Sequence, residues 1–230
     1  TIPTPGSGAT IVKTRIFAGR QQLCRLDRES PLHDYAVDVR QIETLFGKAV
    51  RKCDAIILSD YAKGLLTDEL VAKLMGLARE HQKPVSIDPK PRSKLKFHQP
   101  ELLMPNRVEA LQLAGIEAEP HQPFAAAEVC ARIYEQYRPK HLVITMGADG
   151  MLISQNGKAG KIVRTTPREV CDVAGASDTA ISTLSLALAA GAMIEEAVQF
   201  ANTAAGIVVS RLGTATVTPA ELLAQVIAEE

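Results

Sequence analysis

A run of very small residues leads directly into an aspartate in the C-terminal third of the chain. Residues 172–178 read Asp-Val-Ala-Gly-Ala-Ser-Asp, and an apolar, alanine-rich segment follows as far as Gly191. That segment has the length and the side chains of a buried helix that stops at a glycine. The first backbone amides of such a helix have no partners within it and attract anions, and small residues let an anion approach them closely.

Two interpretations of Asp178 follow from this spacing. In the first, Asp178 is a base that removes a proton from a hydroxyl group while the helix start holds the phosphate under attack. The anion hole would then consist of the backbone amides of Gly175, Ala176 and Ser177. In the second, Asp178 is the N-cap of the helix, a position at which an acidic residue is common. The spacing alone supports both interpretations equally.

A second candidate site contains Asn106 and Glu109, which lie three residues apart just after Pro105. An amide and a carboxylate at a helix start could hold the water shell of Mg²⁺, an ion that usually keeps several waters and takes few protein ligands. The same spacing fits a capping box, with Asn106 at the N-cap and the side chain of Glu109 returning to it. Taken alone, the capping box is the simpler interpretation.

The composition argues against several classes of protein. The 230 residues include 26 basic and 26 acidic ones, so there is no net charge to favour a nucleic-acid surface or a polybasic membrane anchor. The four cysteines are far apart and form no C-x-x-C pair, so we expect reduced thiols in a cytoplasmic protein. No apolar run has the length of a membrane span, and no signal peptide is visible.

The elements that must position these residues alternate along the chain. Short apolar segments at 55–59, 84–88, 102–104 and 141–145 predict strands, and helical periodicity predicts helices over about 39–53, 67–81, 124–137 and 195–211. Further helices end at 114 and begin at 219, and 151–154 with 160–165 favours a hairpin. Continuous apolar strands between helices indicate an α/β fold with a mostly parallel sheet and helices on both faces.

Polar clusters follow the predicted strands at their carboxyl ends. Asp60-Tyr61-Ala62-Lys63-Gly64 and Asp88-Pro89-Lys90 follow the first two strands, and Pro105 to Glu109 follow the third. Ligands bind at the carboxyl edge of such sheets, so this coincidence is the main sequence evidence for an enzyme. Lys63 and Lys90 could bind a substrate that already carries a phosphate, or they could be ordinary surface lysines.

The N-terminal stretch predicts a lead-in followed by a pair of strands. Residues 1–8 are rich in Pro and Gly, and two short runs at 10–18 and 21–27 are joined by a tight turn at Gly19-Arg20. The arginines of these runs, Arg15, Arg20 and Arg25, are more simply a solvated strand face than site residues.

The run 172–178 resembles the second signature of the PfkB (ribokinase-like) carbohydrate kinases, usually written D-T-x-G-A-G-D. The match covers Asp172, Gly175, Ala176 and Asp178, whereas Ser177 replaces the second glycine of the signature. The resemblance implies that Asp178 is the catalytic base and that Asp172 belongs to a monovalent-cation site, which would hold K⁺. It also implies a ribokinase-like fold.

Further motifs of that family match around the ATP side. Pro-Asn-x-x-Glu is a family hallmark tied to Mg²⁺ and the ATP phosphates, which implies roles there for Asn106, Arg107, Val108 and Glu109. The family's T-x-G-x-x-G, which lines the nucleotide, is matched by Thr145, Gly147 and Gly150. Asn202 falls where related kinases place a residue beside the adenine, and the alternative is a partly exposed helix asparagine.

Other segments make the resemblance more specific. Gln21 with its neighbours, the clusters after the first two strands and residues 212–217 resemble kinases that phosphorylate D-glycero-β-D-manno-heptose 7-phosphate at O1 for lipopolysaccharide cores. This implies substrate contacts for Gln21, Lys63 and Lys90. Such a kinase is often the first half of a bifunctional protein, whose nucleotidyltransferase half has no counterpart here.

The resemblance runs from about residue 10 to the end and lacks the family's first part, so we expect one kinase domain over 1–230 that is partial at its N-terminus. The strand pair 10–27 would contribute to its sugar side, and the assembly would be a homodimer. The expected partners are a sugar phosphate and ATP. Two other hypotheses remain open: a PfkB kinase for another sugar or a nucleoside, and a nucleotide-binding remnant with little or no activity.

Ser177 leads to the prediction that catalysis is weakened. If its position needs a left-handed backbone, a serine costs about 1–2 kcal/mol there. If it needs close approach of a phosphate, the serine Cβ would displace that phosphate, and small misplacements can cost about a hundredfold in rate. The third possibility is that Ser177 has ordinary helical dihedrals and its hydroxyl donates to a phosphate oxygen.

Overall fold

The structure is a computed structural model that describes residues 8–19, 21–117, 122–166 and 170–229. A six-stranded sheet in the order β3-β4-β5-β6-β7-β8 forms its centre. The strands are β3 (Ile56–Ser59), β4 (Val85–Asp88), β5 (Leu102–Leu103), β6 (His141–Thr145), β7 (Met151–Gln155) and β8 (Lys158–Val163). The pairs from β3 to β6 are parallel, and the pairs β6-β7 and β7-β8 are antiparallel. The predicted mostly parallel sheet is confirmed.

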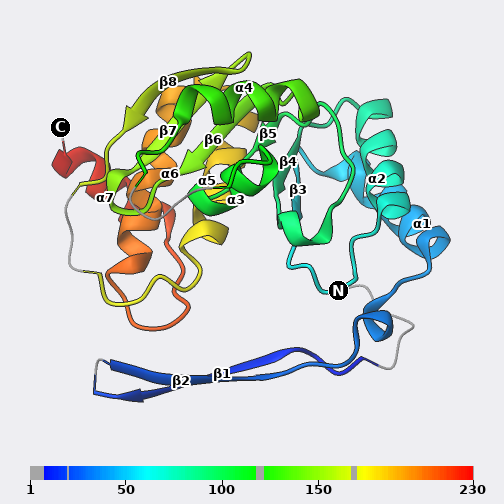
Figure 1. Ribbon diagram of the computed structural model, residues 1–230, viewed down its shortest axis with the longest axis horizontal. Coiled ribbons are helices and arrows are strands. Elements are labelled where there is room, and N and C mark those ends of the chain that lie inside the picture. The colour runs from blue at the N-terminus through cyan, green and yellow to red at the C-terminus, as the bar shows by residue number, and fades with distance from the viewer. Residues whose placement is uncertain (1–7, 20, 118–121, 167–169, 230) are drawn as a thin grey trace.

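Helices cover both faces of this sheet (Figure 1). One face carries α1 (Val39–Ala49), α2 (Asp68–Glu80), α3 (Arg107–Leu113) and α4 (Ala126–Tyr137). The other face carries α5 (Ala176–Ala189) and α6 (Ile194–Val209), and α7 (Pro219–Glu229) packs against α6. Each face therefore has its own hydrophobic cluster, with the sheet between them.

The continuous apolar runs of the parallel strands are explained by these two clusters. Successive residues of a strand point to opposite faces of its sheet. Leu103 accordingly packs with the α1–α4 cluster and its neighbour Leu102 with the α5–α6 cluster, and both are fully buried. A strand covered on both faces needs apolar side chains at every position, which is the pattern that predicted the fold.

The carboxyl ends of β3, β4, β5 and β6 lie at one edge of the sheet, because these strands are parallel and pair in that order. The loops that leave them stay in contact: the Asp60 amide donates to the Asp88 carbonyl at 2.9 Å, and the Thr145 amide to the Pro105 carbonyl at 3.0 Å. Helix α5 packs across β3 and β4. The polar clusters predicted from the sequence are thereby gathered at one edge.

A two-stranded antiparallel hairpin, β1 (Val12–Ala18) with β2 (Gln21–Arg28), extends away from the central sheet (Figure 1). Arg15 lies opposite Arg25, which is half-exposed and paired with Asp27 at 2.7 Å. The predicted solvated position is therefore confirmed for Arg25, whereas Arg15 is partly buried. Arg20 and nearly all of the predicted lead-in lie outside the described residues.

Candidate active site

The catalytic candidate Asp178 lies in the first turn of α5, and its side chain is exposed. The N-cap of α5 is Gly175, so the interpretation of Asp178 as the N-cap is wrong. Asp178 Oδ1 accepts a hydrogen bond of 2.7 Å from the Oη of Tyr61, in the loop that follows β3. The carboxylate is thus placed at the carboxyl edge of the sheet, where a base for a bound hydroxyl would be needed.

The residues before Asp178 form a helix start of the kind that binds anions. Gly175 has a φ of +81°, and a Cβ there would lie 3.3 Å from Thr214 Cγ2, so the position favours glycine on two grounds. Ala176 and Ser177 are the first two residues of α5. Because Ser177 is helical, the prediction that it needs a left-handed backbone is wrong.

Asp172 connects the segment that leads into α5 to the loop after α6. Its Oδ1 accepts from the Ala174 amide at 3.0 Å and its Oδ2 from the Gly213 amide at 3.2 Å. The carboxylate that was predicted to belong to a monovalent-cation site therefore joins these two segments.

Asn106 and Glu109 form a complete capping box at the start of α3. Asn106 Oδ1 accepts from the Glu109 amide at 2.9 Å, and Glu109 Oε2 accepts from the Asn106 amide at 2.8 Å. The other carboxylate oxygen, Glu109 Oε1, accepts from the ammonium group of Lys90. The capping interpretation is thus confirmed, yet the cap leaves one oxygen of Glu109 facing a cation in the site.

Arg107 and Val108, which lie between Asn106 and Glu109, have different surroundings. The guanidinium of Arg107 lies 5.3 Å from the centre of the Phe124 ring, and Val108 is exposed. Within the described residues, neither of the two forms a hydrogen bond or an ion pair with a carboxylate of the site.

Negative charge surrounds the buried Asp88, which the sequence pattern placed at a strand end without assigning it a role. Burial raises the pKa of Asp88 to about 7; nearby Lys90 opposes this rise, and the carboxylates of Glu109, Asp178 and Asp60 add to it. Burial lowers the pKa of Lys90, but its hydrogen bond to Glu109 and the charge of Asp88 leave that pKa raised, so Lys90 stays charged. A site with this excess of carboxylates is suited to a further cation.

Mg²⁺ fits these donors. The ion takes oxygen ligands and uses few from the protein, keeping waters and substrate phosphates for the rest. Glu109 Oε1 already holds a cation, the Lys90 ammonium, and lies beside further carboxylates. Within the described ranges, no group of three or more His, Cys, Asp or Glu is arranged to hold a metal ion by itself. A magnesium site here would therefore depend on water and on the nucleotide.

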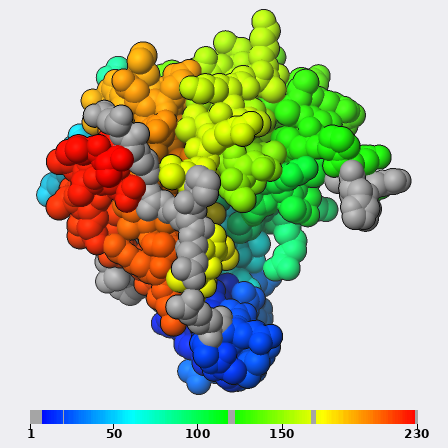
Figure 2. Space-filling model, turned by 90° about the vertical axis from the view of Figure 1, so that its left-hand side faces the viewer, coloured from blue at the N-terminus to red at the C-terminus, as the bar shows by residue number. Residues whose placement is uncertain are grey.

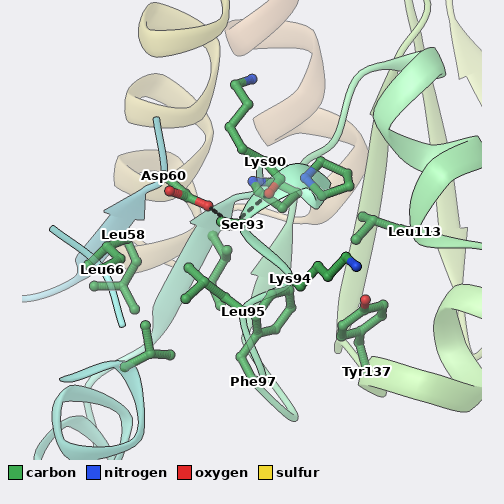
Figure 3. Close-up of a pocket in the computed structure, with 14 residues that line it drawn as sticks. Leu58, Asp60, Leu66, Lys90, Ser93, Lys94, Leu95, Phe97, Leu113 and Tyr137 are labelled. Atoms are coloured by element: carbon green, nitrogen blue, oxygen red, sulfur yellow. Dashed lines mark hydrogen bonds between the residues drawn. The ribbon is translucent and has the colours of Figure 1, made fainter. Parts of the chain in front are cut away.

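A small enclosed pocket lies beneath Lys90 (Figure 3). Its volume of about 30 Å³ has room for little more than one water molecule, so it is not a substrate site. At its rim the Ser93 hydroxyl donates to Asp60 and contacts the Lys90 carbonyl, while Lys90 itself extends away from the apolar side chains (Figure 3). The pocket's rim therefore fixes the backbone from which Lys90 reaches the site.

A larger cavity, of about 460 Å³, lies between the start of the hairpin and the loop after β3. Lys13, Tyr35, Tyr61 and Lys63 are among the residues that line it. This volume lies within the range of small-molecule sites, and its two lysines suit an anionic ligand. Lys13 was missed, because a lysine in a strand of alternating polarity gives no sequence signal that separates it from a solvated face.

The predicted substrate residues are only partly brought together. Lys63 lines the larger cavity and pairs with Glu29 at the base of the hairpin, and Lys90 lies at the neighbouring strand end. Gln21 begins β2 at the turn of the hairpin, opposite Ala18. The eight residues of β2 separate it from Glu29 by about 25 Å along the strand, so Gln21 lies far from Lys63 within one chain.

The ATP-side residues lie along the β6–β7 connection and on α6. Thr145 ends β6 and forms a bridge with Asn106. Gly147 begins and Gly150 follows a short 3-10 turn. Asn202 is buried, donates to the Arg164 carbonyl at 2.9 Å and accepts from Thr165 Oγ1 at 3.0 Å. The alternative of a partly exposed asparagine is therefore wrong, and Asn202 fixes the segment after β8.

Two further properties concern the described residues as a group. The four cysteines, Cys24, Cys53, Cys130 and Cys171, are free thiols. None of the helices in the described part of the chain has both the length and the apolar character needed to cross a bilayer.

Comparison with known proteins identifies relatives over most of the chain. The bifunctional protein HldE of Desulfatibacillum aliphaticivorans is 40% identical over 217 residues, and that of Geobacter sulfurreducens is 36% identical over the same length. Each match covers 94% of this chain and 44% of the relative. The chain thus spans less than half the length of these curated relatives.

Solved structures share the fold at lower identity. Phosphofructokinase-2 of Escherichia coli in complex with potassium superposes with a TM-score of 0.76 at 20% identity, over 96% of this chain and 71% of that one. Arabidopsis thaliana ribokinase complexed with ribose and ATP gives a TM-score of 0.69 at 17% identity, over 89% of this chain and 65% of that one. The predicted ribokinase-like fold is confirmed.

A family model matches residues 35–221, which include α5, the capping box of α3 and the β6–β7 connection. Its description is pfkB family carbohydrate kinase. The motifs, the fold and this match agree, and the chain belongs to the pfkB family of carbohydrate kinases.

Proposed function

We propose that the chain is the kinase part of a cytoplasmic enzyme that transfers the γ-phosphoryl group of ATP to O1 of D-glycero-β-D-manno-heptose 7-phosphate, in the synthesis of lipopolysaccharide core heptose. The observation that carries the proposal is the placement of Asp178 at the start of α5, beside the cluster of Asp88, Lys90 and Glu109. The choice of heptose is supported by the HldE relatives at 36–40% identity.

The proposed reaction is a direct in-line transfer. Asp178 takes the proton of the O1 hydroxyl, and the oxygen of that hydroxyl forms the new bond to the γ-phosphorus while the bond to the bridging oxygen breaks and ADP leaves. The amides of Gly175, Ala176 and Ser177 stabilise the charge of the transferring group at the positive end of α5. Lys90 is proposed to contact a phosphate oxygen in exchange for its bond to Glu109. Bound Mg²⁺ would neutralise charge on the ATP phosphates, with Asn106 and Glu109 organising its water shell.

The larger cavity is the proposed binding place of the sugar phosphate. Tyr61 reaches from its lining to Asp178, so a ligand there lies close to the base. Lys13 and Lys63 supply positive charge for the 7-phosphate, with Lys63 exchanging its pairing with Glu29 for the phosphate. The nucleotide is proposed to lie along Thr145, Gly147 and Gly150, and K⁺ beside Asp172.

We also propose that two chains associate through the hairpin. Cross-strand pairing places Val12, Ile16, Cys24 and Leu26 on one face of the hairpin, and all four are exposed. An apolar strand face of this kind is normally covered in the native assembly. A second copy is the proposed partner, and it would bring a second Gln21 to the assembly.

An acceptor panel tests the proposed function. Purified chain would be incubated with MgATP and heptose 7-phosphate, fructose 6-phosphate, ribose or adenosine, and products would be followed by ³¹P NMR. The expected result is a new anomeric phosphate signal with heptose 7-phosphate. Transfer to another acceptor would indicate a different carbohydrate or nucleoside kinase. Nucleotide binding without transfer to any acceptor would indicate a binding remnant.

A further inference from the structure

The catalytic candidate Asp178 has a hydrogen-bond partner that the family motifs do not include. Tyr61 Oη donates to Asp178 Oδ1 at 2.7 Å, although the two residues are 117 positions apart in the chain. Tyr61 lies in the loop after the carboxyl end of β3, whereas Asp178 lies on α5, which covers one face of the sheet. The ring of Tyr61 also lines the larger cavity, so one side chain contacts both the proposed base and the proposed sugar site.

We propose that Tyr61 is a positioning residue for Asp178: its hydroxyl holds Oδ1 and leaves Oδ2 directed to the hydroxyl group of the acceptor. This inference rests on the proposed function and deepens it. An exposed carboxylate at the start of a helix rotates freely, because the terminal torsion of aspartate has broad, two-fold preferences. A neutral donor fixed to one oxygen removes that freedom without placing a competing positive charge beside the base.

The charges around the pair give this hydrogen bond a second effect. Asp88 on β4 faces both Tyr61 and Asp178, and beyond it lie Asp60, Glu109 and the ammonium group of Lys90. Burial is the main cause of the raised pKa of Asp88, and the carboxylates of Glu109, Asp178 and Asp60 add to it. A hydrogen bond donated to a carboxylate favours its charged form. Tyr61 therefore supplies a neutral donor to Asp178 at a place where most of the neighbouring ionisable groups are carboxylates.

Tyr61 is suited to remain a donor throughout the reaction. Burial raises the pKa of its phenol, and the hydrogen bond to Asp178 raises that pKa further. In the transfer step the acceptor O–H bond breaks and its proton goes to Asp178 Oδ2. The electron pair of that bond forms the new O–P bond, while the bond from the γ-phosphorus to the bridging oxygen of ATP breaks and ADP leaves. Tyr61 keeps its own proton, so it positions the base and takes no part in the proton transfer itself.

Tyr61→Phe removes only the hydroxyl, and Tyr134→Phe is its matched control. Tyr134 lies on α4, and its hydroxyl contacts Asn156 Oδ1 at 3.4 Å, away from the proposed site. We expect Tyr61→Phe to lower kcat about ten- to a hundredfold with the KM for ATP unchanged. The rate of Tyr134→Phe should match that of the wild type. A wild-type rate in Tyr61→Phe would overturn the inference.

A second measurement does not depend on turnover. With ¹³C-labelled tyrosine, the pKa of Tyr61 is read from its ring carbon, and Asp178→Asn should lower that pKa, because a negative acceptor is lost. An unchanged pKa would overturn the contact itself. If the wild-type chain transferred phosphate to none of the acceptors, the proposed function would fall together with this role. Normal transfer by Tyr61→Phe would overturn only the role of Tyr61.

Discussion

Three carboxylates, those of Asp60, Glu109 and Asp178, lie near the buried carboxylate of Asp88 at the carboxyl edge of the sheet, and the ammonium group of Lys90 lies near Asp88 as well. Burying this much negative charge is unfavourable, and the raised pKa of Asp88 reflects that cost, because burial disfavours its charged form. At an edge that binds Mg²⁺ and accepts a proton from the substrate, as we propose for this site, the same charges become useful. The arrangement of single residues therefore favours chemistry over structure as the reason for the cluster.

Glu109→Gln tests the proposed magnesium role. The substitution keeps an oxygen that can accept from the Asn106 amide, so the capping box and α3 should remain intact. It removes a negative charge beside the hydrated ion, so the Mg²⁺ concentration for half-maximal activity should rise severalfold.

Glu80→Gln, at the exposed end of α2, is the control and should leave the Mg²⁺ titration as in the wild type. If Glu109→Gln also gave the wild-type titration, Asn106 and Glu109 would serve only as a helix cap.

Ser177→Gly separates the two explanations of Ser177 that remain. Position 177 lies in the first turn of α5, where a glycine loses helix propensity, so the variant should be less stable by about 0.5–1 kcal/mol. We expect no gain in turnover, because the left-handed penalty is excluded and a serine in the first turn of α5 can donate its hydroxyl to a phosphate oxygen. Thermal melts and kcat check both expectations. A tenfold or larger rise in kcat would instead show that the serine Cβ displaces the phosphate.

At the scale of elements, the β6–β7 connection shows how one motif can contain glycines with different tasks. Gly147 and Gly150 both have a positive φ. A Cβ on Gly147 would meet nothing within 4 Å, whereas one on Gly150 would lie 2.0 Å from the Val163 carbonyl oxygen of β8. The first glycine is needed for its backbone angle alone, and the second also for close approach of two strands.

The two alanine substitutions should therefore differ in stability. Gly147→Ala should cost about 1–2 kcal/mol, the usual penalty of a left-handed alanine. Gly150→Ala adds a backbone clash and should cost more than about 3 kcal/mol, enough to displace β8. Urea titrations of both variants compare the free energies of unfolding. Equal losses would contradict the assignment of a packing role to Gly150.

The elements were largely predictable, because their signals are local. Apolar runs gave β3 to β6 to within two residues, and the small-residue run gave the start of α5. Contacts between distant elements carry no such signal: nothing in the sequence pairs Tyr61 with Asp178, or Asp88 with the carboxylates around it. Both residues do follow predicted strands, so the rule that ligands bind at carboxyl ends marks them as candidates without giving their roles.

At the scale of the whole molecule, the β1–β2 hairpin exposes an apolar face that no other part of the described chain covers. Val12, Ile16 and Leu26 lie on one face of it and are exposed. If a second copy covers this face, light scattering should give the mass of a dimer. Leu26→Lys places a charge in the apolar contact and should give a monomer.

Leu223→Lys on α7 is the matched control, because Leu223 and Leu26 are both 60% exposed. It should leave the dimer intact. A wild-type monomer, or a dimer that survives Leu26→Lys, would contradict association through the hairpin.

The central claim is that Asp178 activates an acceptor hydroxyl for attack on ATP, and Asp178→Asn tests it most directly. Loss of a general base typically lowers the rate by about a hundred- to ten-thousandfold. The measurement is the initial rate of anomeric phosphate formation from heptose 7-phosphate, with nucleotide affinity measured in parallel and Asp54→Asn, exposed just before β3, as the control. The account predicts a loss of that size with ATP affinity unchanged and a wild-type rate for the control. An Asp178→Asn variant that kept most of its rate would contradict it.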